Sequence, residues 1–185
     1  MEKIKVVGAL PYDRVRKDCH AIKDGNNQVI HHYGWQIAKF LNPGFEFGTI
    51  ILVPIPGHTG IANQTLKLSE VISSFLNVRG FFAAVSDVLM CDRHEPLYDI
   101  KKRGEDISKI PLGIRYKSKR HKQELAYWLS RLGTIEQHPE YRLPNLKIYL
   151  VDNVVDTGYT VREVFKVTSN LPVIAVGDSG LHMVE

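Results

Sequence analysis

Residues 148–160 read IYLVDNVVDTGYT, and this stretch decides the fold. Four apolar residues run straight into Asp152, which is typical of a buried parallel strand ending at an acidic residue. Beyond a turn of small residues, apolar side chains recur at helical spacing from Val161 to Phe165. The stretch therefore predicts a strand, a polar loop and a helix. A loop in that position offers backbone N–H groups to an anion.

A second stretch, VPIPGHTG at residues 53–60, repeats this plan. It follows the apolar residues 50–55 and precedes a helix expected over residues 61–76. Pro54 and Pro56 stiffen the loop, whereas Gly57 and Gly60 permit unusual backbone angles and the close approach of a ligand. The loop reads equally well as a tight connection between strand and helix. Two such loops at the carboxyl ends of strands in one parallel sheet favour a shared anion-binding crevice.

Strand-like and helical patterns alternate along all 185 residues. This alternation predicts an α/β fold, with a twisted, mainly parallel sheet flanked by helices, in a single domain over residues 1–185. The apolar runs lie at residues 4–10, 50–55, 81–85, 148–151 and 173–176, and the helical faces at residues 30–41, 68–76 and 125–132.

One charged stretch departs from the alternation. It contains KKRGED and RYKSKRHK and has little periodicity. A long, polar, weakly patterned segment inside a compact domain is typical of a functional loop, so we expect a flexible loop within residues 92–122.

The composition narrows the class of protein. Apolar residues make up 44% and charged residues 24%, which indicates a globular chain, and no apolar run reaches the length of a membrane helix. Cys19 and Cys91 are too few for a disulfide framework or a zinc ribbon, which favours a reducing cytoplasm. The net charge of +4 suits either a nucleic-acid partner or an enzyme that handles polyphosphates.

The loop at residues 152–160 offers three kinds of chemistry. Asp152 can accept hydrogen bonds from ligand hydroxyls or hold hydrated Mg²⁺. Asp156 can accept a proton or position a base. Residues 157–160 offer backbone N–H groups and hydroxyls to a phosphate. A ligand with a diol beside a phosphomonoester satisfies all three, whereas helix capping by Asp156 or Thr157 explains only part of the pattern.

These residues resemble the signature of the type I phosphoribosyltransferases: four apolar residues, two acidic residues, two apolar residues and a Thr/Gly-rich phosphate loop. Asn153 stands where that family usually has its second acidic residue, and it can hydrogen-bond a ribose hydroxyl but brings no charge. VPIP followed by GIANQTLKLSEVIS is similar to the ComF-like branch, without that branch's N-terminal cysteine-rich ribbon.

The resemblance implies the substrate 5-phosphoribosyl 1-pyrophosphate (PRPP), held with Mg²⁺ at Asp152. Asp156 would lie by a purine-like acceptor base and act in catalysis. Arg115 and Lys117 would act with it from a lid that also includes Tyr116 and Lys119. The PRPP-binding residues would be Asp152, Asn153, Val155, Asp156, Thr157, Gly158, Tyr159 and Thr160, and the pyrophosphate loop would be Ile55, Pro56, Gly57 and His58.

Two functions remain open from the sequence. Asp156 and the basic loop favour a phosphoribosyltransferase, which is the preferred interpretation. Asn153 and the positive charge favour a non-catalytic binding protein of the same fold, which senses the ligand or acts with nucleic acid. The acceptor base, the pathway and a homodimeric state depend on contacts that the sequence does not locate.

Overall fold

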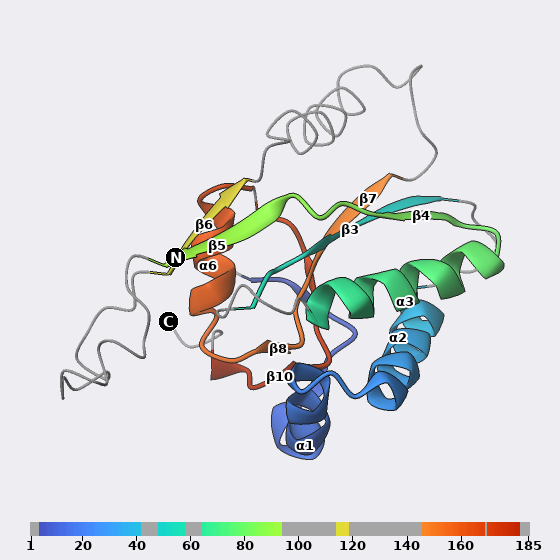
Figure 1. The fold of residues 1–185 in the computed structure, drawn as a ribbon, viewed down its shortest axis with the longest axis horizontal. Coiled ribbons are helices and arrows are strands. Elements are labelled where there is room, and N and C mark those ends of the chain that lie inside the picture. The colour runs from blue at the N-terminus through green and yellow to red at the C-terminus, as the bar shows by residue number, and fades with distance from the viewer. Residues whose placement is uncertain are drawn as a thin grey trace.

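A computed structural model describes residues 4–41, 48–57, 64–93, 114–118, 146–168 and 170–181. Its centre is a five-stranded sheet in which every neighbouring pair of strands is parallel (Figure 1). In spatial order the strands are β1 (Val6–Val7), β9 (Val173–Ile174), β7 (Lys147–Val151), β3 (Thr49–Pro54) and β4 (Phe82–Val85). The predicted α/β architecture with a mainly parallel sheet is therefore confirmed.

Three of these strands continue past a break into a second parallel sheet. Its order is β2 (Leu10–Pro11), β10 (Gly177–Asp178) and β8 (Val154–Val155). The runs expected as single strands at residues 4–10 and 173–176 are thus interrupted, the first at Gly8, whose φ is 76°. At the break in the β7 chain, the Asn153 carbonyl accepts hydrogen bonds from the backbone N–H groups of Val176 and Gly177. Asp152 and Asn153 consequently lie where the two sheets part.

The central strand β3 separates two halves of the core. All six of its residues are buried, as the continuous apolar run TIILVP predicts for a parallel strand covered on both faces. Ile50 and Leu52 pack into one hydrophobic cluster, whereas Ile51 and Val53 pack into the other. Alternate side chains therefore face opposite layers of helices.

Three helices cover one face of the sheet and a short helix covers the other. The three are α1 (Tyr12–Lys23), α2 (Asn27–Leu41) and α3 (Gln64–Val78), and the short one is α6 (Tyr159–Phe165). Figure 1 shows α2 and α3 side by side, with α1 below them.

Helices α2 and α3 confirm the predicted patterns at residues 30–41 and 68–76. Helix α1 was not predicted, although Val15, Cys19 and Ile22 are buried at helical spacing and carry the same signal. The side chain of Asn26 begins α2 by accepting hydrogen bonds from the N–H groups of Gln28 and Val29.

Two antiparallel strands, β5 (Leu89–Arg93) and β6 (Ile114–Ser118), overlap the segment 92–122 that was expected as a loop: β5 ends just inside it and β6 lies within it. Neither strand was among those predicted. The residues between them, 94–113, and the helix expected at 125–132 lie outside the described residues. None of the described helices is both long and apolar enough to cross a membrane.

Candidate functional site

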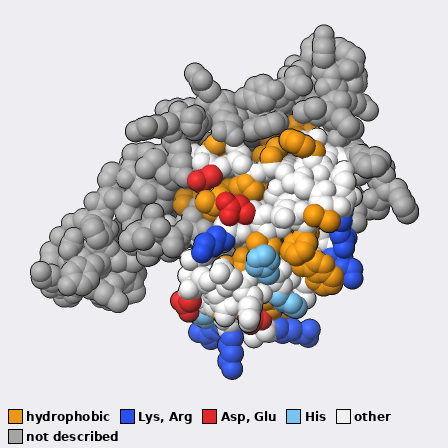
Figure 2. Space-filling view, turned by 45° about the vertical axis from the view of Figure 1, so that its right-hand side comes forward, with side chains coloured by type: hydrophobic (Ala, Val, Ile, Leu, Met, Phe, Trp, Pro, Cys, Tyr) orange, Lys and Arg blue, Asp and Glu red, His pale blue; other side chains and the backbone are white. Residues whose placement is uncertain are grey.

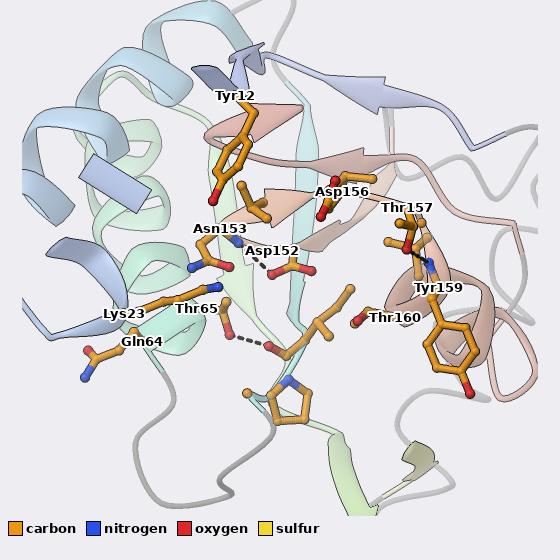
Figure 3. A pocket seen from close by; sticks show the side chains of 17 residues that line it. Tyr12, Lys23, Gln64, Thr65, Asp152, Asn153, Asp156, Thr157, Tyr159 and Thr160 are labelled. Carbon is orange, nitrogen blue, oxygen red and sulfur yellow. Dashed lines mark hydrogen bonds between the residues drawn. The ribbon is translucent and has the colours of Figure 1, made fainter. Parts of the chain in front are cut away.

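The carboxyl ends of β3 and β7 open into a pocket of about 500 Å³ (Figure 3). Both loops singled out in the sequence line it, at residues 55–57 and 152–161. The predicted position of the two loops on the same edge of the sheet is therefore confirmed. The remaining lining residues are Tyr12 and Lys23 from α1, and Gln64 and Thr65 from the first turn of α3.

Asp152 lies at the floor of this pocket with only 9% of its surface exposed. Burial raises the pKa of its carboxyl group from 3.8 to about 6, although the backbone N–H of Asn153, the charge of Lys23 and the backbone N–H of Val154 oppose the shift. The Asn153 N–H donates to the carboxylate at 2.7 Å. A buried carboxylate with a raised pKa inside a pocket is a typical feature of a functional site.

Asn153 is also buried, and its backbone is held in place by the break between the sheets. Besides the two backbone N–H groups, its carbonyl accepts the thiol of Cys19 at 3.7 Å. Burial raises the pKa of that thiol to about 11, so Cys19 stays protonated at neutral pH. The Asn153 side chain points into the pocket beside Lys23 (Figure 3).

The loop after β8 forms the wall of the pocket that lies across from Asn153 and Lys23 (Figure 3). Gly158 begins helix α6 with φ 74°, a left-handed conformation that side chains disfavour. The Thr157 carbonyl accepts a hydrogen bond from the Arg162 guanidinium at 2.9 Å, and the Asp156 carbonyl accepts one from the Ser179 hydroxyl at 2.9 Å. These two hydrogen bonds hold the backbone of the loop in place.

The side chains of this loop diverge. Asp156 is exposed near the mouth, and Thr160 points toward the pocket, whereas the Tyr159 ring points away from it and is 44% exposed (Figure 3). Val155 lines the pocket, but its side chain is buried in the core, so it offers a ligand mainly its backbone. The capping contact at this turn comes from Thr157, whose hydroxyl accepts the Tyr159 N–H at 3.5 Å, whereas the Asp156 carboxylate has no hydrogen-bond partner among the described residues.

The second loop is fixed by α3. The hydroxyl of Thr65 donates to the Ile55 carbonyl at 2.5 Å, and the Ile55 N–H donates to the Val151 carbonyl at 2.9 Å. Pro56 is buried and Gly57 is exposed. The φ of Gly57 is not positive, and an added Cβ there would meet no atom of the described residues within 4 Å. Gly57 therefore does not use the left-handed conformation that glycine permits, and Gly60 lies outside the described residues.

Other candidates from the sequence are not placed in the pocket. Arg115, Tyr116 and Lys117 lie on β6, and the structure describes their backbone only. His58 and Lys119 lie outside the described residues.

Tyr12, Lys23, Gln64 and Thr65 line the pocket but were not selected from the sequence. The helical spacing of Val15, Cys19 and Ile22 predicts α1, and recognising that helix would have drawn attention to Tyr12 and Lys23 at its two ends.

The donor set suits magnesium only in part. Among the described residues, no group of three or more His, Cys, Asp or Glu side chains could hold a metal ion. Mg²⁺ is commonly held by one or two carboxylates together with substrate phosphates and water. Asp152 therefore fits as a single protein ligand for an ion that a phosphorylated ligand brings with it.

Comparisons with known proteins do not assign a family. No family model matches the chain, and no curated protein matches it. One solved structure, a hypothetical protein from Neisseria gonorrhoeae with bound ppGpp, aligns over 96% of this chain and 72% of its own, with 12% sequence identity and a TM-score of 0.30. A similarity this low carries no argument about function.

Proposed function

We propose that this chain binds 5-phosphoribosyl 1-pyrophosphate in the pocket between residues 55–57 and 152–161 and transfers its phosphoribosyl group to a nitrogenous base. The observation that carries the proposal is the meeting of both sequence-selected loops around one pocket with a buried carboxylate, Asp152, at its floor. The pocket volume of about 500 Å³ falls within the usual range for small-molecule sites.

The pocket supplies complementary groups for each part of this ligand. Asp152 and the Asn153 amide would accept hydrogen bonds from the ribose hydroxyls. Residues 157–160 would hold the 5′-phosphate through backbone N–H groups and hydroxyls. The pyrophosphate would extend toward residues 55–57, where Gly57 leaves room.

In the transfer, a ring nitrogen of the base forms a bond to C1′ of the ribose while the bond from C1′ to the pyrophosphate oxygen breaks. The proton on the base nitrogen passes to Asp156, and the electron pair leaves with pyrophosphate. Mg²⁺ held by Asp152 and the ligand phosphates would neutralise charge on the leaving group. Fixed polar groups in a pocket contribute to such a step by positioning and by electrostatic stabilisation.

Binding is tested by a thermal shift experiment with PRPP and Mg²⁺. A ligand that binds only the folded chain raises its unfolding temperature, so we expect stabilisation at millimolar PRPP. Ribose without phosphates, at the same concentration, serves as the control. A folded protein that PRPP does not stabilise would contradict the proposal.

A non-catalytic phosphoribosyl-binding protein is the second candidate. Asn153 favours it, because an amide in this buried position brings no charge to the reacting centre. Pyrophosphate release from PRPP across a panel of purine and pyrimidine bases distinguishes the two. Base-dependent release supports the transferase, whereas tight PRPP binding without release under any base supports the binding protein.

A further inference from the structure

We infer that Lys23, at the carboxyl end of α1, binds the pyrophosphate end of the ligand. This inference rests on the proposed function and adds a residue to the site that neither loop motif contains. It assigns one role to the first helix: α1 completes the pocket with a positive charge.

The first step is the charge balance of the pocket. Its described lining contains two acidic residues, Asp152 and Asp156, and a single basic one, Lys23. A ligand with a phosphate and a pyrophosphate carries several negative charges. Backbone N–H groups can hold one phosphate, and Mg²⁺ at Asp152 would balance part of the charge on the pyrophosphate. Its remaining anionic oxygens favour a further cation that donates hydrogen bonds.

The second step is that Lys23 is available. Among the described residues, the ammonium of Lys23 has no hydrogen-bond or ion-pair partner. Asp18, on the same helix, instead accepts the hydroxyl of Tyr33 at 2.6 Å. Lys23 acts electrostatically on Asp152 without forming a salt bridge to it. Lys23 is exposed and lines the pocket, and no described residue occupies the hydrogen-bond donors of its ammonium.

The third step is position. Figure 3 shows the Lys23 amine pointing inward beside Asn153, on the side of the pocket opposite Thr157 and Thr160. A ligand whose 5′-phosphate occupies the Thr157 side and whose ribose lies over Asp152 extends toward Lys23. Its pyrophosphate oxygens are the groups that reach the ammonium.

Helix α1 also provides a matched control. Lys and Arg side chains gather at the lower end of the molecule in Figure 2, where Figure 1 places α1. Lys17 is exposed on this helix but does not line the pocket. Lys17→Gln and Lys23→Gln therefore change the net charge equally, and only the second removes a charge from the pocket.

The test is calorimetric titration of wild type, Lys23→Gln, Lys23→Arg and Lys17→Gln with PRPP, inorganic pyrophosphate and ribose 5-phosphate, each in the presence of Mg²⁺. A charge-assisted contact corresponds to about a tenfold to hundredfold change in affinity, so we expect Lys23→Gln to weaken PRPP and pyrophosphate binding by that factor. Ribose 5-phosphate should bind within about twofold of wild type, Lys17→Gln should bind all three ligands normally, and Lys23→Arg should retain most of the affinity.

Three results would overturn the inference, and they are distinguishable. Equal PRPP binding by Lys23→Gln and Lys17→Gln removes the role of Lys23 but leaves the proposed function intact. An equal loss for ribose 5-phosphate and PRPP shows that Lys23 does not act on the pyrophosphate end. A folded wild-type protein that binds neither PRPP nor ribose 5-phosphate contradicts the proposed function itself, and the role of Lys23 falls with it. Thermal unfolding of each variant establishes that it is folded.

Discussion

The Asp152 carboxyl lowers the stability of the folded protein when it is ionised, yet it lies in the pocket proposed to bind the ligand. Its carboxyl group is buried at the end of a strand, and burial raises its pKa from 3.8 to about 6. Such a group favours the folded state when it is protonated and opposes it when it is ionised. Its retention at the pocket floor is consistent with a role in ligand binding.

Substitution of Asp152 by Asn should stabilise the protein at alkaline pH. Below pH 3.8 the Asp152 carboxyl is protonated in both the folded and the unfolded chain, and the folded state carries no cost for a buried charge. As the pH rises from 3.8 through about 6, the carboxyl must ionise inside the pocket, and the free energy of unfolding falls. The shift corresponds to a loss on the order of 2–3 kcal/mol in the free energy of unfolding. Urea unfolding should therefore show Asp152→Asn more stable than wild type at pH 8, with the difference shrinking toward pH 4. A difference that is the same at both pH values would contradict the assignment.

Asp156 separates catalysis from binding. Asp156→Asn keeps the size of the side chain but removes the charge that accepts a proton. General-base contributions are typically about a hundredfold to ten-thousandfold, so turnover should fall by that order while PRPP affinity changes little. Asp152→Asn should mainly weaken the Mg²⁺-dependent binding of PRPP. Both variants are assayed for pyrophosphate release and PRPP binding, and undiminished turnover in Asp156→Asn would exclude its proposed role.

At the scale of elements, helices α2 and α3 pack closely because of one glycine. A Cβ at Gly34 would lie 2.4 Å from Cγ1 of Val71. Alanine at this position improves helix propensity by about 1 kcal/mol, whereas overpacking costs about 1–3 kcal/mol. We expect Gly34→Ala to lower the free energy of unfolding, measured by urea denaturation.

The double variant Gly34→Ala/Val71→Ala tests the cause of that loss. If the added methyl group clashes with Val71, the two substitutions together should destabilise the protein less than the sum of their separate effects. Additive losses would mean that the clash is not the cause.

The turn into α6 depends on the backbone of Gly158. Its φ of 74° disfavours any side chain, and alanine there should cost about 1–2 kcal/mol. Gly158→Ala should lower the unfolding temperature and weaken ribose 5-phosphate binding, because the backbone of residues 157–160 would be displaced. Gly57→Ala is the control for stability, since its added Cβ meets no atom of the described part of the chain within 4 Å. Equal unfolding temperatures for the two variants would contradict the prediction.

Some elements could be predicted from the sequence because their patterns are local. The apolar run of β3 and the periodicity of α2 each follow from residues that are adjacent in the chain. The break between β7 and β8 could not be predicted, because the Asn153 carbonyl is held by N–H groups of residues 176 and 177 and by Cys19 of α1. Lys23 was missed for a related reason: its place in the pocket depends on how α1 packs against the sheet, and α1 itself was not predicted.

At the scale of the whole molecule, strand order creates the pocket. The sequence predicted that both loops lie on one edge of a parallel sheet but did not specify which strands are neighbours. In the structure, β3 and β7 are paired directly over residues 50–54 and 147–151, so their following loops face each other across a short distance. The site is therefore a product of topology as much as of motif.

The most direct test of the central claim is a titration of the ¹⁵N-labelled protein with PRPP and Mg²⁺, followed by two-dimensional ¹H–¹⁵N NMR. The proposal predicts saturable changes in the backbone amide signals of Ile55, Gly57 and residues 152–160, while distant amides, such as that of Val78 at the end of α3, stay in place. A folded protein whose pocket amides do not respond at millimolar PRPP, or whose responding amides lie away from this pocket, would contradict it.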